Sequence, residues 1–80
     1  MPSSPTSDQH PSVLLTGASG YVGSVILDRL VKSGAAVRVL ALPETVAGLV
    51  HQDRIQLFEG SLSDRDLLAR ATAGVDVVYH

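Results

Sequence analysis

The sequence predicts an α/β protein in which a parallel sheet is built in the order β-α-β-(α)-β-α-β. Short apolar segments typical of strands alternate with segments of helical periodicity, and this alternation favours a parallel sheet with right-handed crossovers. The first strand-like segment runs into three glycines, Gly17, Gly20 and Gly23, before the first helical segment begins. These two observations indicate half of a doubly wound fold, and each element supports it in turn.

The first strand and helix are the clearest pair. Residues 13–15 form an unbroken apolar run, which suits a strand buried on both faces. Residues 21–33 show helical spacing of apolar side chains, and Gly34 follows as a typical helix stop. The residues expected on the buried stripe of this helix are Val22, Val25, Ile26 and Leu30.

The middle of the chain continues the alternation. Residues 36–42 predict a second strand that Pro43 ends, and residues 54–60 predict a third. Between them, residues 44–52 are weakly helical, and we expect only one or two turns there because a glycine interrupts them.

The last helix is predicted from a capping pattern. Ser63 is the expected N-cap, with Asp64 and Asp66 in the first turn, where negative charge suits the helix dipole. The residues expected on its buried side are Leu67, Leu68 and Ala71. Gly74 ends the helix, and residues 75–80 predict a fourth strand.

Composition narrows the class of protein. Eighty residues form at most one small domain, and a formal net charge of −2 with scattered Lys and Arg gives no basic footprint for nucleic acid. The chain has no cysteine and no apolar run near the ~20 residues of a membrane span. We expect residues 1–11, which are rich in Ser and Pro, to be a disordered leader and residues 12–80 to be the domain. By elimination the expected location is the cytoplasm.

The three glycines predict a phosphate-binding turn. Gly17 would make the tight turn, Gly20 would admit the phosphates of a dinucleotide, and Gly23 would let the helix pack closely on the strand. The expected donors are the backbone N–H groups near Ser19, Tyr21 and Val22, with the Ser19 hydroxyl available to help. The alternative is a glycine-rich turn that merely packs tightly.

The spacing Thr-Gly-x-x-Gly-x-x-Gly resembles the short-chain dehydrogenase/reductase superfamily. It is most similar to the extended branch of NAD-dependent epimerases and dehydratases of sugar nucleotides and their reductase relatives. The later stretch EGSLSDRDLLARATAGVDVVYH is similar to that branch's third strand, crossover helix and fourth strand, where the branch often reads Gly-Asp-Leu and Val-Asp-Val-Val-x-His. The resemblance covers residues 13–80.

The resemblance implies an NAD(P)-binding Rossmann domain and a dinucleotide cofactor, NAD or NADP. Gly17, Gly20 and Gly23 would line its pyrophosphate. Ser61 and Leu62 stand where the family's Asp-Leu pair touches adenine. Serine is shorter and neutral, so the alternative for Ser61 is a solvated turn residue.

The choice between NAD and NADP stays open. An acidic residue at the end of the second strand would bind the ribose hydroxyls of NAD, and an arginine would favour the 2′-phosphate of NADP. Ala41 and Leu42 can do neither, and Pro43 separates them from the nearest carboxylate, Glu44. Arg38 lies inside the strand, where we expect a packed or solvated stem rather than a phosphate clamp.

No catalytic or metal-binding residues are predicted. The family's chemistry uses a Tyr-x-x-x-Lys pair, and neither Tyr21 nor Tyr79 is followed by lysine at that spacing. The histidines His10, His51 and His80 are far apart and lack metal-ligand spacing.

Three interpretations follow from these patterns. The first is that the chain holds the ADP part of a dinucleotide, as the first half of an NAD(P)-dependent epimerase, dehydratase or reductase, and a homodimer is the expected assembly of that parent. The small-molecule substrate would then need residues of a longer parent. The second is a non-catalytic NAD(P) sensor, and the third is a truncated product without a ligand. We also expect the fourth strand to form an exposed apolar edge that makes the isolated chain marginal and prone to associate.

Overall fold

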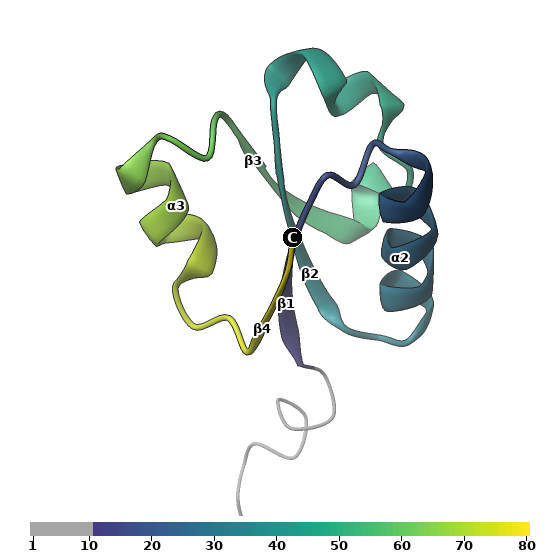
Figure 1. Ribbon diagram of the computed structural model, residues 1–80. Coiled ribbons are helices and arrows are strands. Elements are labelled where there is room, and N and C mark those ends of the chain that lie inside the picture. The colour runs from purple at the N-terminus through teal and green to yellow at the C-terminus, as the bar shows by residue number, and fades with distance from the viewer. Residues whose placement is uncertain (1–10) are drawn as a thin grey trace, which may run out of the picture.

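The computed structural model describes residues 11–80, so the predicted leader, apart from Pro11, lies outside the described residues. Four parallel strands form one sheet in the order β3-β2-β1-β4, as Figure 1 shows, and the predicted α/β fold is confirmed. The strands are β1 (Ser12–Thr16), β2 (Ala36–Ala41), β3 (Ile55–Glu59) and β4 (Val77–Tyr79). The helices are α2 (Tyr21–Lys32) and α3 (Arg65–Thr72), with short 3₁₀ turns η1 (Pro43–Gly48) and η2 (Gln52–Arg54).

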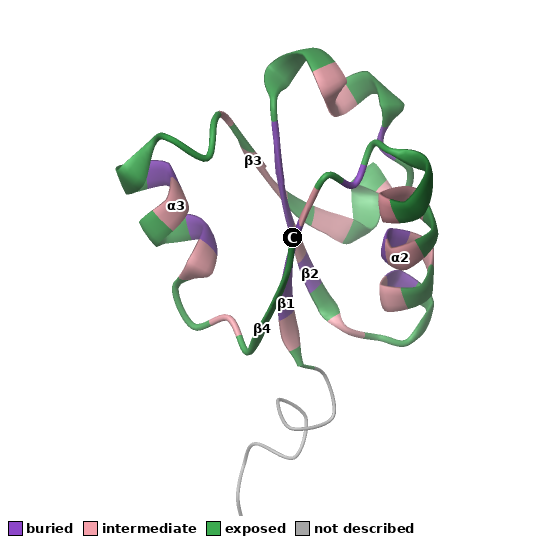
Figure 2. Ribbon diagram, in the orientation of Figure 1, coloured by how far each residue is buried: buried purple, intermediate pink, exposed green. Residues whose placement is uncertain are grey.

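The two helices cover opposite faces of the sheet. Alternation along β2 places Val37, Val39 and Ala41 against α2, while Leu40 faces α3. The most deeply buried large side chains, Leu14, Leu15, Leu27 and Val39, lie in these two layers. Figure 2 shows β1 and β2 carrying buried residues, whereas β4 is exposed along its length. The core is therefore centred on β1 and β2.

The stripe expected on α2 is rotated in the structure. Leu27 and Val31 are buried, Ile26 and Leu30 are half-buried against the core, but Val22 is 67% exposed. The glycine at position 23 explains this rotation. It lies against the turn that precedes the helix, so the face that meets the sheet runs through residue 23 rather than 22. The prediction that Val22 and Val25 are buried was wrong, because periodicity does not register this contact.

The weakly helical segment forms 3₁₀ turns rather than an α-helix. η1 begins at Pro43, and η2 follows after His51, which adopts a left-handed backbone with φ 58°. His51 Nε2–H donates to Asp28 Oδ1 at 2.7 Å, and Lys32 Nζ donates to Asp28 Oδ2 at 3.0 Å. The His51 contact ties the connection to α2, while the Lys32 contact lies within that helix.

The N-cap of α3 is Asp64, not Ser63. The Asp64 carboxylate accepts a hydrogen bond from Leu67 N at 3.1 Å, and the helix begins at Arg65. Ser63 is engaged earlier in the turn, where its N–H donates to Ser61 Oγ at 3.1 Å and the two hydroxyls pair. Aspartate is at least as good an N-cap as serine, so the pattern alone did not separate the two.

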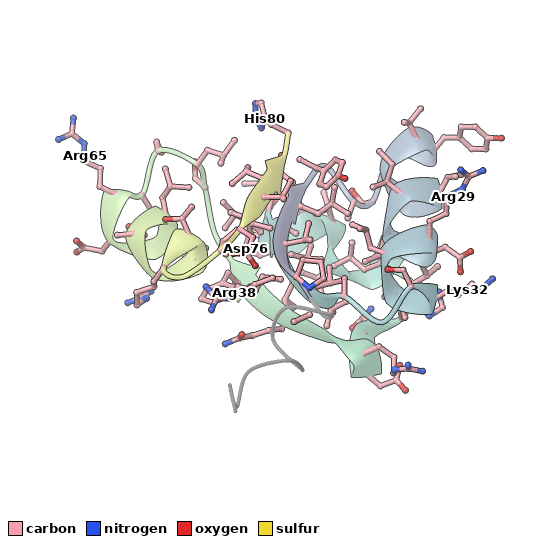
Figure 3. The ribbon with its side chains drawn as sticks, turned by 90° about the horizontal axis from the view of Figure 1, so that it is seen from below. Arg29, Lys32, Arg38, Arg65, Asp76 and His80 are labelled. Atoms are coloured by element: carbon pink, nitrogen blue, oxygen red, sulfur yellow. The ribbon has the colours of Figure 1, made fainter. Side chains whose placement is uncertain are left out.

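Polar contacts hold β4 to β1 at both ends, through Asp76 before the strand and His80 after it, both labelled in Figure 3. Ser12 N–H donates to Asp76 Oδ2 at 2.9 Å, and Asp76 N–H donates to the Ser12 carbonyl at 2.8 Å. At the other end, Thr16 Oγ1 lies 2.8 Å from His80 Nδ1. Because β4 buries little apolar surface, these contacts at its two ends fix its place beside β1.

The exposed strand gives the first testable prediction. Val78 is 53% exposed at the edge of the sheet, so Val78→Lys should reduce self-association of the isolated chain without lowering its melting temperature. Sedimentation velocity over a concentration series checks this. Equal association of both proteins would show that this edge is not the contact.

Asp28 gives a pH-dependent prediction. The hydrogen bonds from His51 and then Lys32 hold the pKa of Asp28 below its ordinary value of 3.8. Because the folded-state pKa is depressed, the contribution is complete well above pH 3.8 and is lost as the pH falls below 3.8 and through the folded-state pKa. Asp28→Asn should lower the melting temperature at pH 7, and the two proteins should converge once the pH is below the folded-state pKa of Asp28.

Calorimetry at a series of pH values measures this difference. A difference between the two proteins that stays constant into acid would contradict the assignment.

Candidate functional site

A cavity of about 640 Å³ opens at the carboxyl ends of the parallel strands. In open α/β sheets this is the edge where ligands bind. Residues from the ends of all four strands line it together with the glycine turn. The lining residues are Leu15, Thr16, Gly17, Ala18, Ser19, Val22, Gly23, Ile26, Leu40, Ala41, Leu42, Thr45, Gly60, Ser61, Leu62, Tyr79 and His80.

The three glycines of the turn differ in what requires them. Gly17 has φ +71°, a left-handed backbone that favours glycine. A Cβ at Gly23 would overlap the Gly17 carbonyl oxygen and lie 2.9 Å from the Ala18 Cα. Gly20 has φ −78° and ψ 170°, which any residue adopts, and a Cβ there would make an ordinary contact of 3.6 Å with the Gly17 carbonyl. Folding therefore accounts for Gly17 and Gly23 but not for Gly20.

The start of α2 is suited to an anion. Gly20 is its N-cap and has no side chain, so the first-turn N–H groups receive no side-chain cap. No acidic residue lies in the first turn, and Arg29 and Lys32 lie in the last, as the dipole favours. At α3 the corresponding position is filled by the Asp64 carboxylate. Of the two helices, α2 is the one whose N-terminus is open to a phosphate.

The structure brings most of the predicted site residues to this cavity. Those in its lining are Gly17, Ser19, Val22, Gly23, Ser61 and Leu62. Gly20 and Tyr21 lie next to them in the chain but not in the lining, and the Tyr21 side chain is 85% exposed. Gly20 N–H donates to the Gly17 carbonyl at 3.2 Å, so it stabilises the turn itself.

Ser61 lies both in the turn after β3 and in the lining of the cavity. Its hydroxyl oxygen accepts from Ser63 N–H and pairs with the Ser63 hydroxyl, which makes it a turn residue. The same residue lines the cavity beside Leu62. The geometry thus leaves Ser61 facing the cavity while its hydroxyl takes part in the turn.

Several lining residues were not singled out from the sequence. Thr16, Thr45 and His80 come from the ends of three different segments, and the topology brings them to one edge. A signal was present for two of them. Thr16 opens the glycine motif and His80 closes the Val-Asp-Val-Val-x-His stretch, and the two side chains pair across the sheet.

Arg38 is engaged away from the cavity. Its Nη1 donates to the carbonyls of Ala73 at 2.7 Å, Ala71 at 3.0 Å and Arg70 at 3.4 Å, all at the end of α3. The guanidinium therefore satisfies carbonyls that a helix C-terminus leaves unpaired. The expected packed or solvated stem is therefore corrected to a cap on the C-terminus of α3, which engages the guanidinium away from the cavity.

Two further expectations concern residues 11–80. Within them, no three His, Cys, Asp or Glu side chains gather as metal ligands. In the same part of the chain, none of the helices has the length and apolar character needed to span a bilayer.

Comparison with known proteins assigns the family. The model of the NAD-dependent epimerase/dehydratase family matches residues 13–80, which is nearly all of the described sheet and helices. The chain belongs to the NAD-dependent epimerase/dehydratase family. The resemblance noted from the glycine motif is therefore confirmed.

Several of the curated relatives that the chain matches have the names of oxidoreductases. The chain is 39% identical over 66 residues to a 4-hydroxy-2-methyl-3-oxo-4-farnesyl-3,4-dihydroquinoline-1-oxide ketoreductase of Stigmatella aurantiaca, which covers 82% of the chain and 20% of the relative. It is 35% identical over 69 residues to a decarboxylating sterol-4-alpha-carboxylate 3-dehydrogenase of Dictyostelium discoideum, which covers 86% of the chain and 21% of the relative. The chain thus spans about a fifth of the length of these relatives.

Solved structures show the same fold. A short-chain dehydrogenase/reductase of Veillonella parvula superimposes with a TM-score of 0.73 at 16% identity, over 86% of this chain and 34% of that one. A second structure from that organism, solved in complex with NADP, superimposes with a TM-score of 0.68 at 18% identity over the same shares. These likenesses establish the Rossmann-type architecture of the family member described above.

The contacts of Arg38 give a prediction for stability. Arg38→Met keeps an apolar stem but removes the donors to the end of α3, so the free energy of unfolding should fall by about 2 kcal/mol. Urea denaturation followed by circular dichroism measures this loss. An unchanged midpoint would show that the guanidinium does not support α3.

Proposed function

We propose that the chain binds the ADP portion of NAD or NADP in the cavity at the carboxyl edge of its sheet. In this proposal residues 12–80 are the first half of the dinucleotide-binding domain of an NAD(P)-dependent enzyme. Membership of the NAD-dependent epimerase/dehydratase family supports a dinucleotide as the ligand. The cavity volume lies within the ~300–1,000 Å³ typical of small-molecule sites.

The observation that carries the proposal is that the fold tolerates a side chain at position 20, although glycine also suits its N-cap position. Neither its backbone angles nor its neighbours within the chain require a glycine there. A ligand that approaches the backbone from outside does require one, because a Cβ would stand between the helix N-terminus and a pyrophosphate. The pyrophosphate would then accept from the first-turn N–H groups of Tyr21 and Val22, with the Ser19 hydroxyl beside them.

The rest of the ADP follows from the strand order. With the pyrophosphate at the start of α2, the adenosine would extend over the ends of β2 and β3, where Leu42, Ser61 and Leu62 line the cavity. Leu62 would supply an apolar contact for the adenine ring, and Ser61 would lie beside it. Ser61 has no carboxylate to accept a hydrogen bond from the adenine amino group. Adenine recognition would therefore depend on shape and apolar contact.

The activity proposed for the whole enzyme is oxidoreduction. The named relatives above are a ketoreductase and a dehydrogenase, which supports a reductase or dehydrogenase within a family that also contains epimerases and dehydratases. When bound, the nicotinamide supplies or accepts hydride. This chain's own residues would hold the ADP end, while a substrate, a Tyr-x-x-x-Lys pair and a homodimer contact would belong to a longer parent. A cytoplasmic location is part of the same proposal.

Gly20→Ala tests the proposal. The substitution fits the observed backbone, so the protein should stay folded with a melting temperature close to that of the unchanged chain, because the less flexible unfolded chain offsets the poorer N-cap that alanine makes. The affinity for NAD, NADP and ADP should fall at least about tenfold, because the Cβ blocks the approach of the pyrophosphate. Isothermal titration calorimetry measures both proteins.

Gly48→Ala is the matched control. Gly48 lies in η1 outside the cavity lining, and the nearest atom to its Cβ position is 3.9 Å away. The control should bind as the unchanged chain does. Undiminished affinity in a folded Gly20→Ala protein would refute the binding site.

A further inference from the structure

The adenosine end of the cavity is built without charge. Leu42 is 44% exposed and lines the cavity directly after β2, about twenty residues beyond the glycine turn. At this place a carboxylate accepts from the ribose hydroxyls of NAD, or an arginine binds the 2′-phosphate of NADP. A leucine side chain offers neither an acceptor nor a positive charge. Thr45 lines the cavity nearby, but its hydroxyl donates to the Leu42 carbonyl at 2.8 Å.

Among the described residues, the rest of the cavity lining also lacks acidic residues, lysine and arginine. The imidazole of His80 is at the end of β4, and β1 separates that strand from β2. Adjacent strands lie about 4.8 Å apart, so His80 is roughly 10 Å from the end of β2.

The charges nearest in the fold do not supply what the lining lacks. Arg38 lies in β2, whose carboxyl end lines the cavity. Its guanidinium, however, is bound to carbonyls at the end of α3. Glu44 follows Leu42 closely and Glu59 lies beside the end of β2, yet neither carboxylate lines the cavity. Neither selecting group is therefore in place at the ribose.

We propose that this site binds NAD and NADP with comparable affinity, because Leu42 leaves the ribose without a selecting charge. The inference rests on the proposed function and deepens it. The two ligands differ by one phosphate of charge about −2, which would stay in water at the open side of the cavity. No carboxylate in the lining repels that phosphate and no cation attracts it. Affinity would come from the ADP portion that the two dinucleotides share.

Calorimetric titration of the full chain with NAD, NADP and ADP tests this inference. The two dissociation constants should agree within tenfold, which corresponds to about 1.4 kcal/mol. A ratio beyond tenfold in either direction would overturn the inference and leave the proposed function standing. Failure of all three ligands to bind the folded chain would refute the proposed function and the inference together.

Charged substitutions at Leu42 test the position itself. Leu42→Asp should shift the ratio at least tenfold toward NAD, since a carboxylate accepts from the ribose hydroxyls and repels the 2′-phosphate. Leu42→Arg should shift it at least tenfold toward NADP. Val50 provides the control, because it is 43% exposed and lies outside this cavity. Val50→Asp and Val50→Arg should leave the ratio unchanged, and smaller shifts at Leu42 or equal shifts at Val50 would overturn the assignment.

Discussion

The contact between Gly23 and the Gly17 carbonyl is the constraint on which the rest of the structure depends. Only a residue without a Cβ lets α2 approach the turn after β1 so closely. That approach fixes the rotation of the helix, which turns Leu27 and Val31 into the core. It also fixes the direction in which the helix N-terminus opens, which is toward the carboxyl edge of the sheet. Packing and the proposed phosphate site thus share one cause.

β4 is a short, exposed strand that polar contacts hold at both ends. Its side chains are exposed, so apolar burial contributes little to its position. The backbone pairing with β1, the hydrogen bond from Ser12 N–H to the Asp76 carboxylate and the contact between Thr16 and His80 hold it in register instead. Arg38 does the same for α3 by satisfying carbonyls at the helix end. Directed polar contacts therefore hold the elements that the small core reaches least, and one of them, between Thr16 and His80, joins two residues of the cavity lining.

Sequence reasoning predicted the α/β fold and the element order because apolar runs and glycine positions report on local structure. It was wrong where the outcome depends on individual contacts that periodicity and residue preference do not report. The rotation of α2 follows from Gly23 meeting Gly17, and the choice of Asp64 as N-cap follows from Ser63 pairing with Ser61. The glycine part of the candidate site came from its motif. The position of Leu42 beside the ribose came from its place after the second strand, whereas Thr45 and His80 were not predicted in the lining, since only the sheet topology brings those segments together.

The proposed function depends on the diphosphate of a dinucleotide binding at the start of α2. Two-dimensional NMR of the ¹⁵N-labelled chain during titration with ADP tests it most directly, because each backbone N–H is observed separately. The account predicts that the largest shifts fall on the amides of residues 18–23, with smaller ones near Leu42 and Leu62. Shifts centred on α3 or β4, or a folded chain whose spectrum does not change, would contradict it.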